Sequence, residues 1–522
     1  MIAIIALLPA IKRQEIALKL RILDWFVIIC AILFIHYAVF FQLFLFWGLS
    51  PKLNIHRYGL SPSILSYVVL VISVIFILIR ISFYRLKSSQ ISKFKSLIDN
   101  LISRRMYSEV YIILEDNINA VFSCANKEYS MGKLYSKIKR RTENYYPIDF
   151  FFAERNGKKL RNPNYFMKLI FRIILLIMPN YERRTSDANY LLRTIMLKKD
   201  LVIYFVSNAP YLGMRLLQYK SYFLDAYVDE YFKSLIQQKS SILYFELKNN
   251  QNTNEYAYQI DPHNILLSYL FNPASRAEQL GVWRPIGEYI IQHLDELNNS
   301  STDKYLIQNE NYYEDGKWES SLYVGIFFFD VMIKSALKQN IEWHMWLYYY
   351  DYFVDRIDRN ISRFKKRDTG YYEWDSPYHY LLYTCISNLC DYIRAIEKIP
   401  LEQKNVILKS SNLEHENGNI VKSSILCLMI CIRKIILSNN ISDDFKWYLV
   451  KIPFSVLFTL QRSEKLSEYF KCFRNALIAG DFIKNKDDHE YKLELAKYAR
   501  KIDRVHNNPE EINKFISDLE NI

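Results

Sequence analysis

Two long apolar runs stand near the beginning of the chain. Residues 25–48 form a run of 24 residues without Asp, Glu, Lys or Arg, and residues 63–79 form a second run of 17. At about 1.5 Å per residue, a helix over the first run exceeds the roughly 30 Å of a bilayer core, and the second run reaches the lower limit of about 17 residues. The polar segment 50–62 between them contains two prolines and a glycine. The pattern predicts a transmembrane helical hairpin within residues 1–86.

Basic residues flank this hairpin unevenly. Four precede the first run and five follow the second within residues 80–95, whereas the turn holds two. Because Lys and Arg favour the cytoplasmic side, we expect a two-pass protein of a bacterial inner membrane, with both termini and its bulk in the cytoplasm. His36 and Gln42 lie within the first run, where an interhelical hydrogen bond is favoured over a pore lining.

Apolar residues at spacings of three and four predict helices through most of the remaining chain. Residues 241–248, SILYFELK, are instead the best strand candidate. The scarcity of Gly (12) and Pro (14) favours helices joined by polar loops. We therefore expect a mainly α fold, in which the hairpin is followed by a large all-α body. The predicted helices cover residues 91–101, 187–198, 209–238, 262–271, 285–297, 322–337, 341–364, 424–437, 463–480, 491–502 and 508–519.

Composition divides the chain after the hairpin into three further segments. Residues 87–180 form a basic juxtamembrane helical region, residues 181–300 a helical domain, and residues 301–522 an aromatic-rich helical domain. The net charge of the chain is +13, and residues 80–172 alone carry 19 Lys and Arg against 8 Asp and Glu. Basicity confined to the membrane-proximal segment indicates an anionic partner near the bilayer.

The most basic stretch surrounds a group of aromatic residues at positions 145–152. Basic residues interleaved with aromatics suit anionic lipid headgroups, and they also suit nucleic acid through phosphate contact and base stacking. Lipid is favoured over nucleic acid. A solvated flank without a specific ligand is favoured as strongly as these two interpretations together. Residues 165–178 form a third apolar run, too short and too charged to span, which predicts a buried or interfacial helix. The candidate contact residues are Lys133, Lys137, Lys139, Arg140, Arg141, Arg155, Lys158, Lys159 and Arg161.

The catalytic motifs of common enzyme classes are missing from the sequence. It contains no GxxxxGK[ST], GxSxG or HExxH pattern. Glu246 and Lys248 end the strand candidate, with Asp225 upstream. This set resembles the motif of metal-dependent nucleases of the PD-(D/E)xK type, which implies a metal held by the acids and a water activated beside the lysine. The favoured alternative is two surface acids and a lysine whose stem lies along the surface.

A second constellation surrounds His344 and His379 in a tyrosine-rich region. A metal or a flat ligand would suit it, but a hydrogen-bonded core histidine is the favoured interpretation. The seven cysteines are scattered and lack zinc-site spacing, so we expect reduced core residues and no cofactor.

These observations favour a membrane-anchored, non-enzymatic interaction or effector protein. Its layout is similar to that of membrane-anchored effectors of bacterial antiviral defence, which implies a cytosolic helical sensor and a hairpin that acts on the membrane. The expected partners are anionic lipid, a protein and a second copy of the chain. The alternatives are a membrane-tethered nucleic-acid-binding protein or metal-dependent nuclease, and a membrane scaffold for a partner complex.

Overall fold

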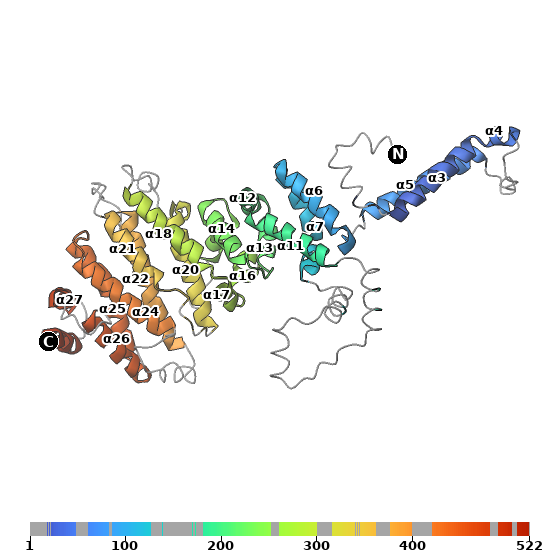
Figure 1. Cartoon of the computed structure of the whole chain (residues 1–522). Helices are drawn as coiled ribbons and strands as arrows, with labels where there is room; N and C mark the ends of the chain where they lie inside the picture. Colours follow the sequence, from blue (N-terminus) through green and yellow to red (C-terminus); the bar gives the residue numbers. More distant parts are fainter. Residues whose placement is uncertain are drawn as a thin grey trace. The chain divides into compact units, whose positions relative to one another are not determined.

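The computed structural model is helical and contains no strand among the residues it describes (Figure 1). This confirms the predicted mainly α class. The described residues are 18, 20, 22–47, 61–82, 86–126, 138, 170, 173, 181–251, 260–299, 316–339, 341, 343, 345–361, 376–398, 420–480, 489–503 and 509–520.

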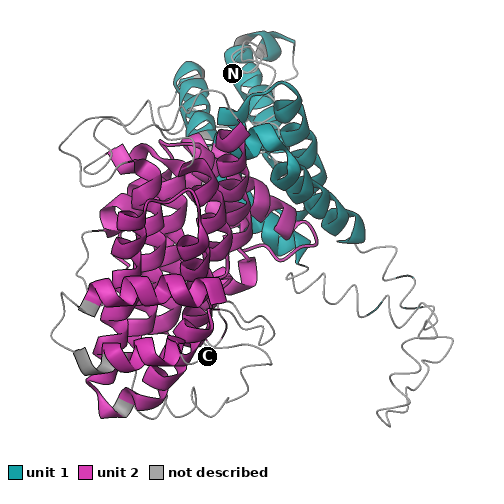
Figure 2. Cartoon of the chain, turned by 90° about the vertical axis from the view of Figure 1, so that its left-hand side faces the viewer, with its two compact units in different colours: residues 1–204 teal, residues 205–522 magenta. Residues whose placement is uncertain are grey.

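The chain separates into two compact units, residues 1–204 and residues 205–522 (Figure 2). Helix α12 (Lys199–Asn208) carries the chain from one unit into the next. The finer division at residues 86, 180 and 300 stays a prediction.

The first unit begins with a helical hairpin made of α3 (Ile22–Val39) and α5 (Pro62–Ser82), with the short α4 (Phe41–Phe46) after α3 (Figure 1). The two long helices pack against each other. Ile28 of α3 and Ile77 of α5 are buried in their shared core, which places the start of α3 beside the end of α5. The helices are therefore antiparallel, as the two apolar runs predict.

The predicted crossing of a membrane by this hairpin is not supported. Within the ranges that the structure covers, no helix combines the length and the apolar character that a bilayer crossing requires.

Three further helices form the rest of the described first unit. They are α6 (Ile91–Ser103), preceded by the 3-10 turn η2 (Ser88–Gln90), α7 (Tyr107–Ala125) and α11 (Tyr181–Leu197). α11 packs on both α6 and α7. Ile91, Phe94, Ile98 and Leu101 of α6 are all buried, as their spacing predicts. Asp187 of α11 is tied back to α6, where it accepts hydrogen bonds from Ser92 and Lys95.

The helices of the second unit pack in chain order. α14 lies on α18, α18 on α20 and α21, α21 on α22 and α24, and α22 on α24 and α25, followed by α26, α27 and α28 (Figure 1). The bounds are α13 Pro210–Leu216, α14 Leu224–Gln237, α15 Ile242–Asn250, α16 Ile265–Phe271, α17 Ser275–Leu280, α18 Trp283–Asn299, η3 Gly316–Glu319, α20 Ser321–Lys338, α21 Tyr349–Ile361, α22 Pro377–Arg394, η4 Ala395–Lys398, α24 Ile420–Leu437, α25 Asp443–Gln461, η5 Glu464–Leu466, α26 Ser467–Ala479, α27 His489–Asp503 and α28 Pro509–Glu520.

Three sequence predictions about this unit are wrong. The strand predicted at residues 241–248 is helix α15. The long helix predicted from residue 341 begins at Tyr349, because Met345 and Trp346 both adopt left-handed backbone conformations with φ of 51°. The helix predicted over residues 209–238 is divided into α13 and α14.

Candidate functional site

Most of the large apolar side chains that the described residues expose lie on the hairpin and the short segment after α3. Away from their mutual contact, α3 and α5 present almost only apolar groups, and this set is called the hairpin surface below. Soluble monomers rarely expose such a contiguous apolar area, and larger ones mark sites of contact with protein or lipid. The hairpin surface comprises Phe26, Val27, Ile29, Leu33, Phe34 and Val39 of α3, with Ile64, Tyr67, Val68, Leu70, Ile72, Val74, Ile75 and Ile79 of α5.

The two charged residues of these helices pair with each other. α3 and α5 contain Asp24 and Arg80 and no other Asp, Glu, Lys or Arg. Nε of Arg80 donates to Oδ1 of Asp24 over 2.9 Å, and the Asp24 side chain is 4% exposed. Asp24 lies in the first turn of α3 and Arg80 in the last turn of α5, where each charge suits its helix dipole. The pair neutralises the hairpin at its open end.

His36 lies on the outer side of α3. Its side chain is exposed and its ring contacts Phe40, with 6.2 Å between the ring centroids. The interhelical hydrogen bond predicted for His36 does not occur among the described residues. The Gln42 side chain lies outside them.

The nine candidate contact residues for anionic lipid or nucleic acid all lie outside the described residues. These are Lys133, Lys137, Lys139, Arg140, Arg141, Arg155, Lys158, Lys159 and Arg161. Of the apolar run 165–178, Ile170 and Ile173 are helical, and the rest lies outside the description. The predicted binding role of this basic segment stays a prediction.

The nuclease-like residues do not have the arrangement that the resemblance implies. Glu246 and Lys248 lie on helix α15, and Asp225 lies on helix α14. Asp225 and Lys248 are exposed, whereas Glu246 is buried. The strand prediction was wrong because the run 241–248 is apolar enough to fit either a strand or a buried helix.

Glu246 instead caps the start of α16. Its two carboxylate oxygens accept the backbone N–H groups of Leu266 and Leu267 at 3.0 and 2.9 Å. Burial raises the pKa of Glu246, and the backbone hydrogen bonds offset part of that rise. Asn264, which directly precedes α16, donates through its side chain to the backbone oxygen of Glu246. Both oxygens of the carboxylate are thus engaged by backbone donors that a helix N-terminus leaves unpaired.

The two histidine candidates for a metal site are not brought together in the described structure. His344 lies outside the described residues. His379 is buried near the start of α22, where Nδ1 lies 2.7 Å from Oγ of Ser376 and the ring packs edge-on against Phe445. Searching the described residues finds no group of three His, Cys, Asp or Glu side chains placed to hold a metal ion. Five of the seven cysteines are buried and all seven are free, whereas Cys30 is exposed and Cys472 is partly exposed.

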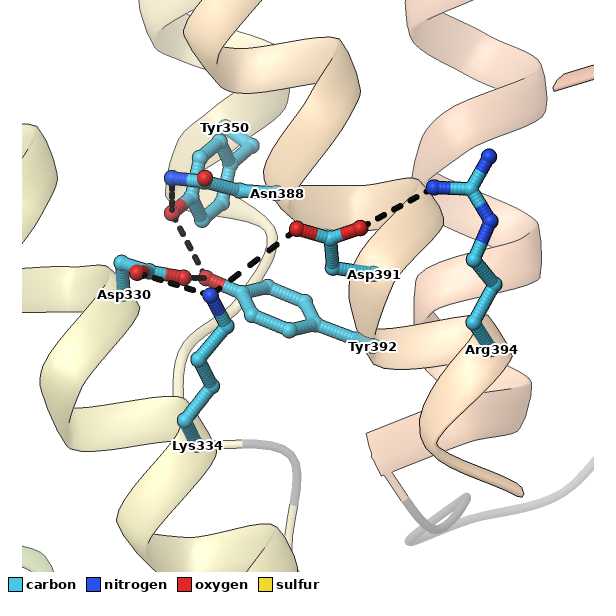
Figure 3. A network of polar contacts seen from close by, with 7 residues as sticks. All are labelled: Asp330, Lys334, Tyr350, Asn388, Asp391, Tyr392 and Arg394. Atoms are coloured by element: carbon cyan, nitrogen blue, oxygen red, sulfur yellow. Dashed lines mark hydrogen bonds and ion pairs between the residues drawn. The ribbon is translucent and has the colours of Figure 1, made fainter. Parts of the chain in front are cut away.

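Sequence reasoning missed a buried network of polar side chains in the second unit (Figure 3). Nδ2 of Asn388 donates to the Tyr350 hydroxyl over 3.1 Å, the hydroxyls of Tyr350 and Tyr392 lie 2.8 Å apart, and Tyr392 donates to Oδ1 of Asp330 over 3.0 Å. Because Tyr392 gives its single hydroxyl proton to Asp330, Tyr350 is the donor to Tyr392. All three bonds therefore point toward the Asp330 carboxylate.

Charged residues continue this network toward the surface. Nζ of Lys334 lies 3.0 Å from Oδ2 of Asp330 and 3.9 Å from Oδ2 of Asp391. Asp391 also pairs with Arg394, which donates to Oγ of Ser455 on α25. Burial raises the pKa of Asp391, and the charges of Lys334 and Arg394 lower it in part.

The hydrogen bonds and ion pairs of this network hold neighbouring helices together. Burial raises the pKa values of Tyr350 and Tyr392 far above the usual range, so both phenols stay protonated and act as hydrogen-bond relays. The network joins α20, α21 and α22 through directional contacts (Figure 3), and the hydrogen bond from Arg394 to Ser455 extends it to α25. One sequence signal was present: Asp330 and Lys334 lie four residues apart inside the strongly apolar run 322–337.

No protein family model, curated protein or solved structure matches this chain. Its function is therefore argued from its own residues.

Proposed function

We propose that this chain is a membrane-anchored, non-enzymatic interaction protein. Its hairpin surface lies in the apolar phase of a bacterial inner membrane, and the bulk of the chain lies on the cytoplasmic side. The second unit binds a protein partner through its stacked helices. The basic residues between positions 133 and 161 contact anionic headgroups beside the hairpin.

The observation that carries the proposal is the pairing of Asp24 with Arg80. A charged side chain in hydrocarbon is costly unless it pairs or reaches the interface. Helices α3 and α5 hold two such side chains, and they form an ion pair with each other at 2.9 Å. The remaining outer surface of the two helices is almost entirely apolar, and an α-helix satisfies its interior backbone groups within itself. An element of this kind is adapted to lipid rather than to water.

The geometry of the hairpin suits entry from one face of the membrane. Its ion pair lies at the open end, where the flanking chain is basic, and its apolar surface lies beyond that pair. The ion pair then stays near the headgroups and the helices enter together. Since the helices are antiparallel, both ends of the hairpin remain on the same side.

A flotation experiment with the full chain tests this proposal. Vesicles of zwitterionic and anionic phospholipids are mixed with detergent-purified protein, the detergent is removed, and the mixture is floated through a density gradient in sodium carbonate. We expect the wild-type chain to float and to resist carbonate. Recovery in the aqueous fraction would overturn the proposal.

Matched arginine variants test the assignment of the surface, because arginine stays charged in alkaline carbonate. Leu33→Arg combined with Ile72→Arg introduces two charges on the hairpin surface, at about 2.5–3.5 kcal/mol each near a bilayer centre. Ile112→Arg combined with Leu197→Arg introduces the same charges on exposed apolar positions of α7 and α11. We expect the first variant to lose most of its carbonate resistance and the second to behave as the wild type. Equal behaviour of the two variants would refute the role of the hairpin surface.

The effector role, in a bacterial antiviral defence system, has its own test. If the hairpin perturbs the membrane, overexpression of the full chain is toxic to a bacterial host. Deletion of residues 1–86 then abolishes toxicity while the second unit still folds. Toxicity that survives the deletion would place the activity elsewhere in the chain.

A further inference from the structure

His36 occupies an otherwise apolar outer face of α3. Ile29 and Leu33 lie seven and three positions before His36. Phe40, directly after the last residue of α3, lies four positions after it. At these spacings all four side chains share one side of the helix. The three apolar members are 52%, 65% and 51% exposed. Asp24, which pairs with Arg80, and Ile28, which packs with Ile77 of α5, are buried on a different side of the helix. This set of four residues is called the His36 face.

The position of His36 along the hairpin places it deep in the membrane of the proposed function, on which this inference rests. His36 follows Asp24 by twelve residues, which corresponds to roughly 18 Å along α3. With the Asp24–Arg80 pair at the headgroups, His36 lies near the middle of a bilayer core of roughly 30 Å. Lipid tails offer its imidazole no hydrogen bond.

Within the part of the hairpin that the structure describes, the His36 ring contacts Phe40, and no side chain or backbone group forms a hydrogen bond with the imidazole. A polar group in hydrocarbon without a hydrogen bond is unfavourable, so the buried imidazole needs a partner from another molecule.

A second copy of the chain meets this requirement better than any other occupant. Copies inserted from the same side carry His36 at the same depth, so two hairpins side by side bring their imidazoles to one level. A neutral imidazole has one N–H donor and one bare nitrogen acceptor, and so it complements itself. A two-fold arrangement places identical faces against each other. The internal Asp24–Arg80 pair leaves helices α3 and α5 themselves without net charge to oppose this approach.

We propose that two copies of the chain associate in the membrane through their His36 faces. A hydrogen bond joins His36 of one copy to His36 of the other. Ile29, Leu33 and Phe40 pack around it.

The test uses full-length chains labelled with donor and acceptor fluorophores at their C-termini and reconstituted in vesicles. Energy transfer is followed as the protein is diluted with lipid. We expect His36→Leu to raise the dissociation constant in lipid by roughly 3- to 30-fold, the factor that one interhelical hydrogen bond supplies in a membrane. His36→Asn, which keeps a donor and an acceptor, retains most of the association. If His36→Leu associates as strongly as the wild type, the proposal is refuted.

Cysteine cross-linking tests the geometry separately. In a Cys30→Ala background, Leu33→Cys lies on the His36 face and Val27→Cys lies on the same helix about 180° away from His36. We expect oxidation to give a covalent dimer with Leu33→Cys and little with Val27→Cys. Equal cross-linking at both positions would overturn the proposed face.

The flotation result separates this inference from the proposed function. A chain that floats but shows no energy transfer at any protein-to-lipid ratio keeps the proposed function and refutes the pairing. A chain that does not float refutes both.

Discussion

The Tyr392 hydroxyl donates to the Asp330 carboxylate over 3.0 Å, although the two residues are 62 positions apart in the chain. The contact joins α22 to α20 inside the second unit. Both residues are buried, at 0% and 2% exposure, so neither can exchange this bond for one to water. The other carboxylate oxygen of Asp330 accepts a hydrogen bond from Lys334 over 3.0 Å.

Replacing Tyr392 with Phe should destabilise the second unit. The change removes one donor to a buried carboxylate and leaves the Tyr350 hydroxyl without its acceptor, so we expect a loss of about 1–3 kcal/mol in the free energy of unfolding. Chemical denaturation followed by circular dichroism measures it. Tyr222→Phe is the matched control, because Tyr222 is fully exposed and its change should stay within about 0.5 kcal/mol. Equal effects of the two variants would remove the energetic role assigned to the network.

Glu246→Ala should destabilise the protein, whereas Asp225→Ala and Lys248→Ala should not. Glu246 holds two backbone N–H groups at the start of α16, and loss of such a cap costs about 0.5–2 kcal/mol. Asp225 and Lys248 are exposed, so their replacement should change the melting temperature little. Scanning calorimetry of the three variants measures this difference. If all three keep the wild-type melting temperature, the capping role of Glu246 is wrong.

Two glycines allow backbone strain to be separated from steric clash. Gly480 and Gly281 both end helices with positive φ, +67° and +62°. An added Cβ at Gly480 would lie 2.5 Å from Cε1 of the buried Tyr491, whereas at Gly281 the nearest atom is 3.8 Å away.

We expect Gly281→Ala to cost about 1–2 kcal/mol for the left-handed conformation. Gly480→Ala should cost more, because the Tyr491 ring is held by its hydrogen bond to the Leu477 carbonyl. Urea denaturation of both variants gives the comparison. A Gly480→Ala loss no larger than that of Gly281→Ala would show that the ring moves aside freely.

His293 should make stability depend on pH near neutrality. Burial lowers its pKa, and Glu296 offsets this in part, so the folded protein prefers the neutral imidazole. The stabilisation is then present above the unfolded pKa of about 6.5 and is lost as the pH falls through the folded pKa. His293→Gln removes this contribution.

The measurement is the difference in unfolding free energy between wild type and His293→Gln at several values from about pH 7.5 to 5. The wild type should lose stability relative to the variant as the pH falls. His489→Gln, at an exposed position that begins α27, controls for replacement of a histidine as such. A difference that is constant with pH would contradict the buried, neutral state of His293.

Local sequence signals predicted much of the helical structure. The spacing of Ile91, Phe94, Ile98 and Leu101 identified the buried side of α6, because a helix places residues three and four apart on one face. The predicted helix over residues 262–271 contains α16, and Gly480 ends α26 in a left-handed conformation, as a glycine cap at that position predicts. The two apolar runs located α3 and α5.

The wrong predictions concern segments whose hydrophobic pattern is compatible with two different backbone conformations. The run at 241–248 has no clear period, so it could not distinguish a strand from a short buried helix. The aromatic spacing that predicted a helix from residue 341 continues through Met345 and Trp346, whose left-handed conformations interrupt it. The spacing of apolar side chains in the sequence does not show whether a residue has a right-handed or a left-handed backbone conformation.

The polar network could not have been assembled from the sequence. Asp330, Tyr350 and Tyr392 lie on three helices, and their meeting depends on how those helices pack. The same holds for Asp24 and Arg80, which are 56 positions apart and meet because α3 and α5 are antiparallel. Partners so distant in sequence are determined by tertiary structure, which local patterns do not encode.

The chain-order packing of the second unit has a consequence for how this unit unfolds. The main contacts of α27 and α28 are with each other and with α24 and α25, far along the row from α14 and α18. Helices α27 and α28 can therefore unfold locally, and only their contacts with each other and with α24 and α25 are lost. A ligand that binds the unfolded C-terminal segment would therefore leave the rest of the second unit folded.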